Sequence, residues 1–221
     1  PLLTQYCDPS YNFPSQEESI RSTLTALDKH LSTNRSKTTL FLFGSYSIGK
    51  EKVFMAAAEH CGAKMYVSSA KMRLIHCFGW RDTDMKRLTR DVVSTNFHVL
   101  SMGQLNFKRI GVYLATLRRR YTDVVAFRPT GWAFGGRGYG GKRSRAVGSG
   151  GVNLNGISSV QQKRVGNGVD VTIYGIAYSE HSSFSELQAS IHAFRPLATI
   201  PTVNGYTLTA VRQMLTLLGV Q

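Results

Sequence analysis

Continuous apolar runs alternate with helix-like segments along this chain, and this alternation constrains the fold more than any other feature. Residues 38–43 form an apolar run typical of a strand that is buried on both faces. A glycine-bounded loop, residues 44–49, follows it, and residues 50–60 have the pattern of a helix. A strand followed by a loop and a helix indicates an α/β fold.

The same alternation continues along the chain. We predict a short strand at residues 64–67, helical structure around residues 85–93, an amphipathic helix at residues 107–120 and a buried strand at residues 124–127. Strands that alternate with helices predict a mostly parallel sheet with helices on both faces.

Two capping boxes mark helix starts, because in each a serine is followed three residues later by a glutamate. Ser15 with Glu18 precedes one apolar stripe, and Ser183 with Glu186 precedes another. We therefore predict helices that begin at these two serines.

A break in composition interrupts the alternation. Residues 134–168 contain 11 of the chain's 21 glycines, six Lys or Arg and no acidic residue. We interpret this segment as a flexible basic loop rather than a folded element. After it we predict strands at residues 169–176 and 197–200 and a closing helix at residues 208–218.

The charge balance favours polyanionic partners. The 27 Lys and Arg exceed the 13 Asp and Glu, which gives a net charge of +14 at pH 7. Each phosphate that a cationic side chain neutralises releases condensed counterions. Charge alone does not distinguish a nucleic-acid enzyme from a ribosomal-type or other basic protein. No apolar run approaches the roughly 20 residues that span a bilayer, so we expect no membrane partner.

The loop after the first strand matches G-x-x-x-x-G-K, the start of a nucleotide-binding loop. Such a loop needs Ser or Thr next to hold Mg²⁺, and Glu51 stands there instead, which disfavours nucleotide hydrolysis. Backbone amides at a helix start, the Ser45 and Ser47 hydroxyls and Lys50 still form a candidate seat for a single phosphate. The alternative is a tight turn with no ligand.

His60-Cys61 and His76-Cys77 offer four potential zinc ligands. Adjacent residues on a helix point about 100° apart, so neither pair easily supplies two ligands to one ion. We interpret these residues as structural and reject a zinc site there.

Two further places are candidate sites. Residues 126–132 follow a buried strand, at the edge where ligands of open α/β sheets collect. Arg128 could clamp a phosphate bidentately, Thr130 could add a hydroxyl and Trp132 could stack on a base, although a turn with a core tryptophan fits equally well. His181 lies between a strand and a helix start, a position favoured for ligands and catalysts, but a lone histidine is usually only a polar residue.

Six segments, in order along the chain, together resemble one known family. They are YCDPSYNFPSQ (6–16), GSYSIGKEKVF (44–54), QLNFK (104–108), AFRPTGW (126–132), YGIAYSEHSS (174–183) and IPTVN (200–204). This series is similar to the C-terminal half of the metallo-β-lactamase/β-CASP DNA cross-link repair nucleases, the group that includes Artemis and Apollo. The likeness covers most of the chain apart from residues 134–168.

The resemblance implies a β-CASP Rossmann-like parallel sheet over residues 1–133, the basic loop at residues 134–168, and the C-terminal strands and helices of a metallo-β-lactamase αββα sandwich over residues 169–221. It also implies a nuclear enzyme with 5′→3′ exonuclease action on DNA that carries a 5′-phosphate, in the repair of interstrand cross-links. The implied cofactor is Zn²⁺, with Mg²⁺ or another divalent ion as the alternative.

The family's late active-site histidine matches His181, which is thereby implied to be catalytic and a metal ligand. Other matching stretches are expected to line the path of the DNA and its phosphates, and the residues assigned to this path are Ser45, Tyr46, Ser47, Lys50, Arg128 and Thr130.

Two departures from the family pattern bear on activity. No H-x-H-x-D-H motif occurs, so the main metal ligands either lie upstream or are absent, and we expect this part alone to be inactive. Leu3 stands where the family has an acidic residue, and leucine cannot bind a metal. Two alternatives remain open: a non-catalytic nucleic-acid-binding module, and the weaker one of a nucleotide-binding protein.

Overall fold

The computed structural model describes residues 9, 13–33, 38–117, 120–130, 156–166, 168–200 and 207–219. The chain forms two compact units, Ser15–Tyr178 and a smaller one that combines Pro1–Pro14 with Ser179–Gln221. Leu3, Trp132 and residues 134–155 and 167 of the glycine-rich segment lie outside the described residues, so the predictions about them stay predictions.

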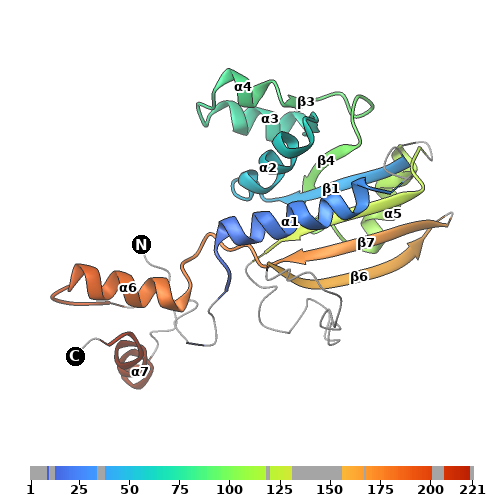
Figure 1. Cartoon of the computed structure of the whole chain (residues 1–221). Coiled ribbons are helices and arrows are strands. Elements are labelled where there is room, and N and C mark those ends of the chain that lie inside the picture. Colours follow the sequence, from blue (N-terminus) through green and yellow to red (C-terminus); the bar gives the residue numbers. More distant parts are fainter. Residues whose placement is uncertain are drawn as a thin grey trace. The chain divides into compact units, whose positions relative to one another are not determined.

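A mostly parallel sheet lies at the centre of the larger unit (Figure 1). Its strands are β1 (Thr39–Ser45), β2 (Met65–Tyr66), β3 (Leu88–Thr89), β4 (Phe97–Ser101), β5 (Asp123–Pro129), β6 (Ile157–Val165) and β7 (Val169–Ile176). Their order across the sheet is β3-β2-β4-β1-β5-β7-β6, and only the pairing of β6 with β7 is antiparallel.

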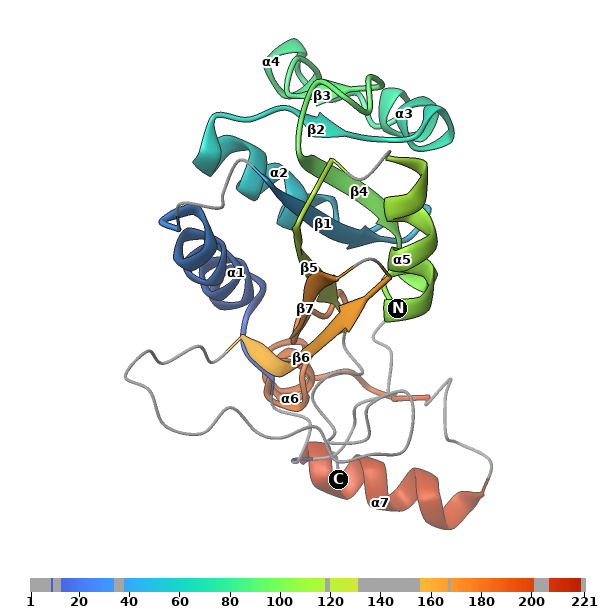
Figure 2. The same cartoon turned by 90° about the vertical axis from the view of Figure 1, so that its right-hand side faces the viewer.

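Helices cover both faces of this sheet. The helices of the larger unit are α1 (Gln16–Leu31), α2 (Glu51–Cys61), α3 (Ser69–His76), α4 (Asp82–Met85), the 3-10 turn η3 (Met102–Gln104) and α5 (Phe107–Thr116). Phe41 and Phe43 pack with residues of α1 and α2, whereas Leu40 and Leu42 pack with residues of α5. Figure 2 shows α1 and α2 on one side of the sheet and α5 on the other.

The structure confirms the predicted α/β class and its main elements. All seven residues of β1 are buried, as expected of a strand covered on both faces. The capping boxes of Ser15 with Glu18 and of Ser183 with Glu186 are both formed, and α1 and α6 (Phe184–Phe194) begin directly after these serines.

Two predicted elements are wrong. Residues 85–93 are not helical: α4 ends at Met85 and β3 follows, because Asp91 and Thr89 turn the chain by hydrogen bonds to nearby backbone amides. Residues 197–200 form no strand, and Leu197 and Ile200 are exposed without a ladder partner among the described residues.

The glycine-rich segment and the strand after it also differ from the prediction. Residues 157–165 are not a loop but form β6, which pairs with β7 across a turn where Gly166 and Gly168 have positive φ. Strand β7 in turn pairs with β5 over seven residues, so it belongs to the same sheet. The larger unit extends to Tyr178. The division into a β-CASP portion over residues 1–133 and a metallo-β-lactamase portion over residues 169–221 stays a prediction.

The smaller unit contains α6 and α7 (Leu208–Leu218) in its described part. Phe184, Leu187 and Leu218 form its apolar cluster, with Ile191 packed against it. Among the helices of the described chain, none has the length and apolarity to cross a membrane.

Helix α1 is fixed to the β6–β7 hairpin by close backbone approach. The Ser19 hydroxyl donates to the Ala177 carbonyl at 2.7 Å, and the Gly156 amide donates to the Ser22 hydroxyl at 3.1 Å. A Cβ atom on Gly156 would lie 2.6 Å from the Ser19 Cα, so only glycine fits without displacing α1.

We expect Gly156→Ala to lower the free energy of unfolding by about 1–3 kcal/mol, the usual cost of overpacking. Gly111→Ala is the control, because Gly111 lies inside α5 with no atom near its missing Cβ and alanine favours helix by about 1 kcal/mol. Urea unfolding measures both. Equal effects at the two positions would contradict this account of α1 packing.

Candidate nucleic-acid interface

The carboxyl ends of β1 and β4 form a topological switch point. The two strands are adjacent and parallel, yet β1 leads into α2 on one face of the sheet and β4 leads toward α5 on the other. Loops 44–50 and 102–106 therefore diverge at this edge, where open α/β sheets bind ligands. A Cβ on Gly44 would lie 2.8 Å from side-chain atoms of Met102 and Leu105, so this glycine lets η3 close over the end of β1.

Loop 44–50 is stabilised by its own groups. The Ser45 hydroxyl is buried and donates to the Gly49 carbonyl at 2.9 Å. The Gly49 amide donates to Glu51 Oε1 at 2.9 Å. The Glu51 carboxylate thus accepts the hydrogen bond that the Gly49 amide would otherwise donate to a bound phosphate. This internal anion is a further argument against a nucleotide-binding loop.

Lys71, on α3, holds this loop in place. Its Nζ donates to the Tyr46 carbonyl and the Ser47 carbonyl, each at 2.9 Å, and to Glu51 Oε1 at 2.6 Å. The residue is only 8% exposed. Sequence reasoning did not identify Lys71, because a single lysine in a helix gives no sign that it bonds to loop carbonyls 24 and 25 residues earlier.

Lys50 also points into the protein. Its Nζ donates to the Tyr178 carbonyl at 3.4 Å and lies 5.1 Å from the centroid of the Tyr178 ring and 5.9 Å from that of Tyr46. The two ring contacts are cation–π interactions. The buried Lys50 has left-handed backbone geometry, with φ at 72°.

Arg128 lies near the end of β5, at the same edge of the sheet. It is partly buried, yet its guanidinium makes no hydrogen bond, ion pair or ring contact with any residue that the structure describes. Its register partner on the adjacent strand β7 is Gly175, which has no side chain. Thr130 is buried just beyond the strand, and its amide donates to the Ile176 carbonyl at 2.9 Å.

His181 lies in the smaller unit, two residues before the cap of α6. Its amide donates to the Ser179 hydroxyl at 3.0 Å, and that hydroxyl donates to the His181 carbonyl at 3.1 Å. The backbone at His181 is thus held by a local turn. The described residues contain no group of three or more His, Cys, Asp or Glu side chains that could hold a metal ion, so they do not by themselves form a metal centre.

Residues with shifted pKa values occupy packing positions. Burial lowers the pKa of His98, which is fully buried and bonds to the Tyr113 hydroxyl and the Thr95 carbonyl. Burial also raises the pKa of Cys61 to about 11, so this thiol stays protonated at neutral pH. The neighbouring His60 bonds to Asp28 at 2.7 Å. These groups stabilise the fold rather than form a reactive centre.

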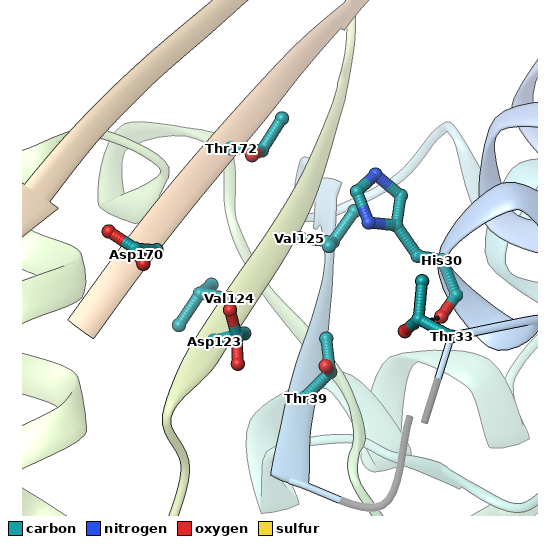
Figure 3. A pocket seen from close by; sticks show the side chains of 8 residues that line it. All are labelled: His30, Thr33, Thr39, Asp123, Val124, Val125, Asp170 and Thr172. Carbon is teal, nitrogen blue, oxygen red and sulfur yellow. Dashed lines mark hydrogen bonds between the residues drawn. The ribbon is translucent and has the colours of Figure 1, made fainter. Parts of the chain in front are cut away.

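A pocket of about 400 Å³ lies at the opposite, amino edge of the sheet (Figure 3). Its lining residues are His30, Thr33, Thr39, Asp123, Val124, Val125, Asp170 and Thr172. Asp170 is ion-paired with Arg164, and His30 bonds to the Tyr174 hydroxyl at 2.9 Å. Two carboxylates make this pocket a poor place for a polyanion.

We expect Lys71→Met to lower the free energy of unfolding by about 3 kcal/mol, because it leaves the largely buried Glu51 carboxylate without its cation. Adding Glu51→Gln should recover more than half of the loss, since no charge then remains unpaired. Lys64→Met removes an exposed lysine and serves as the control, with a change within about 0.5 kcal/mol. Urea unfolding measures Lys71→Met, Glu51→Gln and the double variant. If the stability loss of the double variant equals the sum of the losses of the two single variants, the pairing is contradicted.

Comparison with known proteins identifies relatives along almost the whole chain. The DNA cross-link repair protein SNM1 of Arabidopsis thaliana is 38% identical over 203 residues, which are 92% of this chain and 38% of that protein. The human DNA cross-link repair 1A protein is 36% identical over 92% of this chain and 17% of its own length. The Schizosaccharomyces pombe DNA cross-link repair protein pso2/snm1 is 30% identical, with 92% of this chain and 36% of that protein covered.

The chain thus spans less than half the length of these relatives. The profile of the DNA repair metallo-beta-lactamase family matches residues 82–206, more than half of the chain, which confirms the resemblance drawn from the six motifs. The chain belongs to the DNA repair metallo-beta-lactamase family.

Proposed function

We propose that this chain is the DNA-holding part of a metal-dependent DNA nuclease that acts in interstrand cross-link repair in the nucleus. The names of its relatives support the repair process, and the net charge of +14 supports a polyanionic substrate. The finer proposal is 5′→3′ exonuclease action on a strand with a 5′-phosphate. Alone, the chain is expected to hold DNA without cutting it.

The observation that carries this proposal is the position of Arg128. Its guanidinium is partly buried at the carboxyl edge of the sheet and has no partner among the described residues. A desolvated guanidinium gains most from an anion that it can contact with two parallel hydrogen bonds, and a DNA phosphate is such an anion. We therefore place the phosphate path along the carboxyl edge, with Arg128 as its clamp and Thr130 beside it.

The residues proposed to contact DNA differ in their exposure. Ser45 and Lys50 are buried and have internal partners. They would therefore affect DNA binding only indirectly, by fixing the conformation of loop 44–50. Tyr46 and Ser47 are exposed and remain available to DNA. Direct contact is thus assigned to Tyr46, Ser47 and Arg128.

His181 is the proposed contribution of this chain to the metal centre, with Zn²⁺ as the first candidate and Mg²⁺ as the alternative. Imidazole nitrogen is a common ligand of Zn²⁺. Because the described residues gather no group of three ligands, the other ligands would come from outside them, and no catalytic step can be assigned to these residues alone.

A non-catalytic nucleic-acid-binding module is the second candidate function. The net charge of +14 fits it, whereas the family match favours the nuclease. Both candidates predict DNA binding with a steep salt dependence, and only the nuclease predicts metal-dependent cleavage in the full-length protein.

We expect Arg128→Gln to raise the Kd for DNA about 10-fold, or ~1.4 kcal/mol. It should also reduce the slope of log K against log salt by about 0.7–0.9, because one phosphate contact is lost. Arg164→Gln is the matched control, since it removes an arginine at the amino edge of the same sheet. Equal changes in slope for both variants would argue against a specific seat at Arg128.

For His181→Ala in the full-length protein, we expect loss of exonuclease turnover together with loss of bound metal, because a ligand is removed. DNA affinity should change little. His192→Ala, at the last turn of α6, is the control for a histidine in the same unit. Normal turnover and normal metal content in His181→Ala would overturn the proposed role.

A further inference from the structure

Loop 44–50 offers little to a phosphate, because the groups suited to one are already engaged. The Gly49 amide is bonded to Glu51, the Ser45 hydroxyl to the Gly49 carbonyl, and the buried Lys50 ammonium to Tyr178. A phosphate at this loop would compete with the Glu51 carboxylate for the same amide. A ligand at this loop would therefore meet the part of the loop whose groups are not engaged internally.

The exposed part of the loop is its tip, residues 46–48. Tyr46 is 47% exposed and Ile48 is 67% exposed, with the exposed Ser47 between them. An aromatic ring and a branched aliphatic side chain present apolar surface rather than charge. Such surface suits the face of a nucleobase, which stacks on aromatic side chains in single-stranded complexes.

Two buried lysines hold this tip in one conformation. Lys71 Nζ bonds to the carbonyls of Tyr46 and Ser47, and the Lys50 ammonium lies 5.9 Å from the centroid of the Tyr46 ring. A loop that is fixed before binding loses less entropy when it binds. The ring is thus both exposed and held in place.

We propose that Tyr46 is a stacking platform for one nucleobase of the bound DNA strand, supported by Ile48, and that Lys71 and Lys50 are its positioning residues. The inference rests on the proposed function, because it assumes that DNA runs along the carboxyl edge of the sheet. In this arrangement a nucleobase contacts the loop after β1, and a phosphate contacts Arg128 at the end of β5. Strands β1 and β5 are hydrogen-bonded neighbours.

The experiment uses a series of short, 5′-phosphorylated single-stranded oligonucleotides, each with one abasic site at a different position. Fluorescence anisotropy measures the Kd of this chain for each oligonucleotide. For the wild type, one abasic position or two adjacent ones should raise Kd about 10-fold, within the range of base–aromatic stacking. Tyr46→Ala should raise Kd for the intact strand by the same factor, and the abasic site should then add nothing further. Tyr46→Phe should behave as the wild type.

Controls separate stacking from charge and from misfolding. Tyr46→Ala should leave the salt slope unchanged, because the ring carries no charge, whereas Arg128→Gln lowers that slope. Phe194→Ala removes an exposed aromatic ring from the smaller unit and should leave the abasic profile intact. Circular dichroism confirms that each variant is folded.

Each remaining outcome contradicts the proposal. A flat abasic profile in the wild type, or effects of Tyr46→Ala and the abasic site that simply multiply, would exclude stacking on Tyr46. If Arg128→Gln weakens binding and Tyr46→Ala does not, the stacking inference fails while the proposed function stands. If the wild-type chain binds no DNA, the proposed function fails and the inference fails with it.

Discussion

Burial of β1 on both faces is the constraint on which the rest of the larger unit depends. Phe41 stacks on Phe97 at 4.9 Å between ring centroids, and Phe43 stacks on Phe127 at 5.1 Å, so aromatic contacts tie β1 to both of its neighbours. The opposite face is filled by Leu40 and Leu42. Because both faces are covered, a ligand reaches β1 only at its ends, and the end before α2 is the switch point.

At the carboxyl edge, loop 44–50 was expected to hold a phosphate, but its polar groups bond to one another instead. Glu51 serves as an internal anion for loop 44–50, and Lys71 neutralises it from α3. At the same edge the Arg128 guanidinium is partly buried and has no partner among the described residues, and Tyr46 is exposed. In the proposed function, Arg128 as a phosphate clamp and Tyr46 as a base platform, at the ends of adjacent strands, hold one DNA strand without reading its sequence.

Sequence patterns predicted the elements whose signals are local. The apolar run of β1 and the capping box of Ser15 were sufficient to predict a strand and a helix start. Burial on two faces requires consecutive apolar residues, and a capping box requires a serine and a glutamate three residues apart, so both are visible in the sequence. Strand β6 was missed because its polar residues and flanking glycines resemble a loop, and only pairing with β7 makes it a strand. The Lys71–Glu51 pair was missed for a similar reason, since it joins residues of separate helices.

Amide hydrogen exchange of this chain, with and without a 5′-phosphorylated DNA strand, tests most directly whether the carboxyl edge holds DNA. The account predicts that DNA slows exchange in residues 44–50, 102–106 and 128–130, where the loops meet. Exchange near Asp123 and Asp170, at the amino edge, should stay unchanged. Protection confined to the amino edge, or no protection at the carboxyl edge under conditions where DNA is bound, would contradict it.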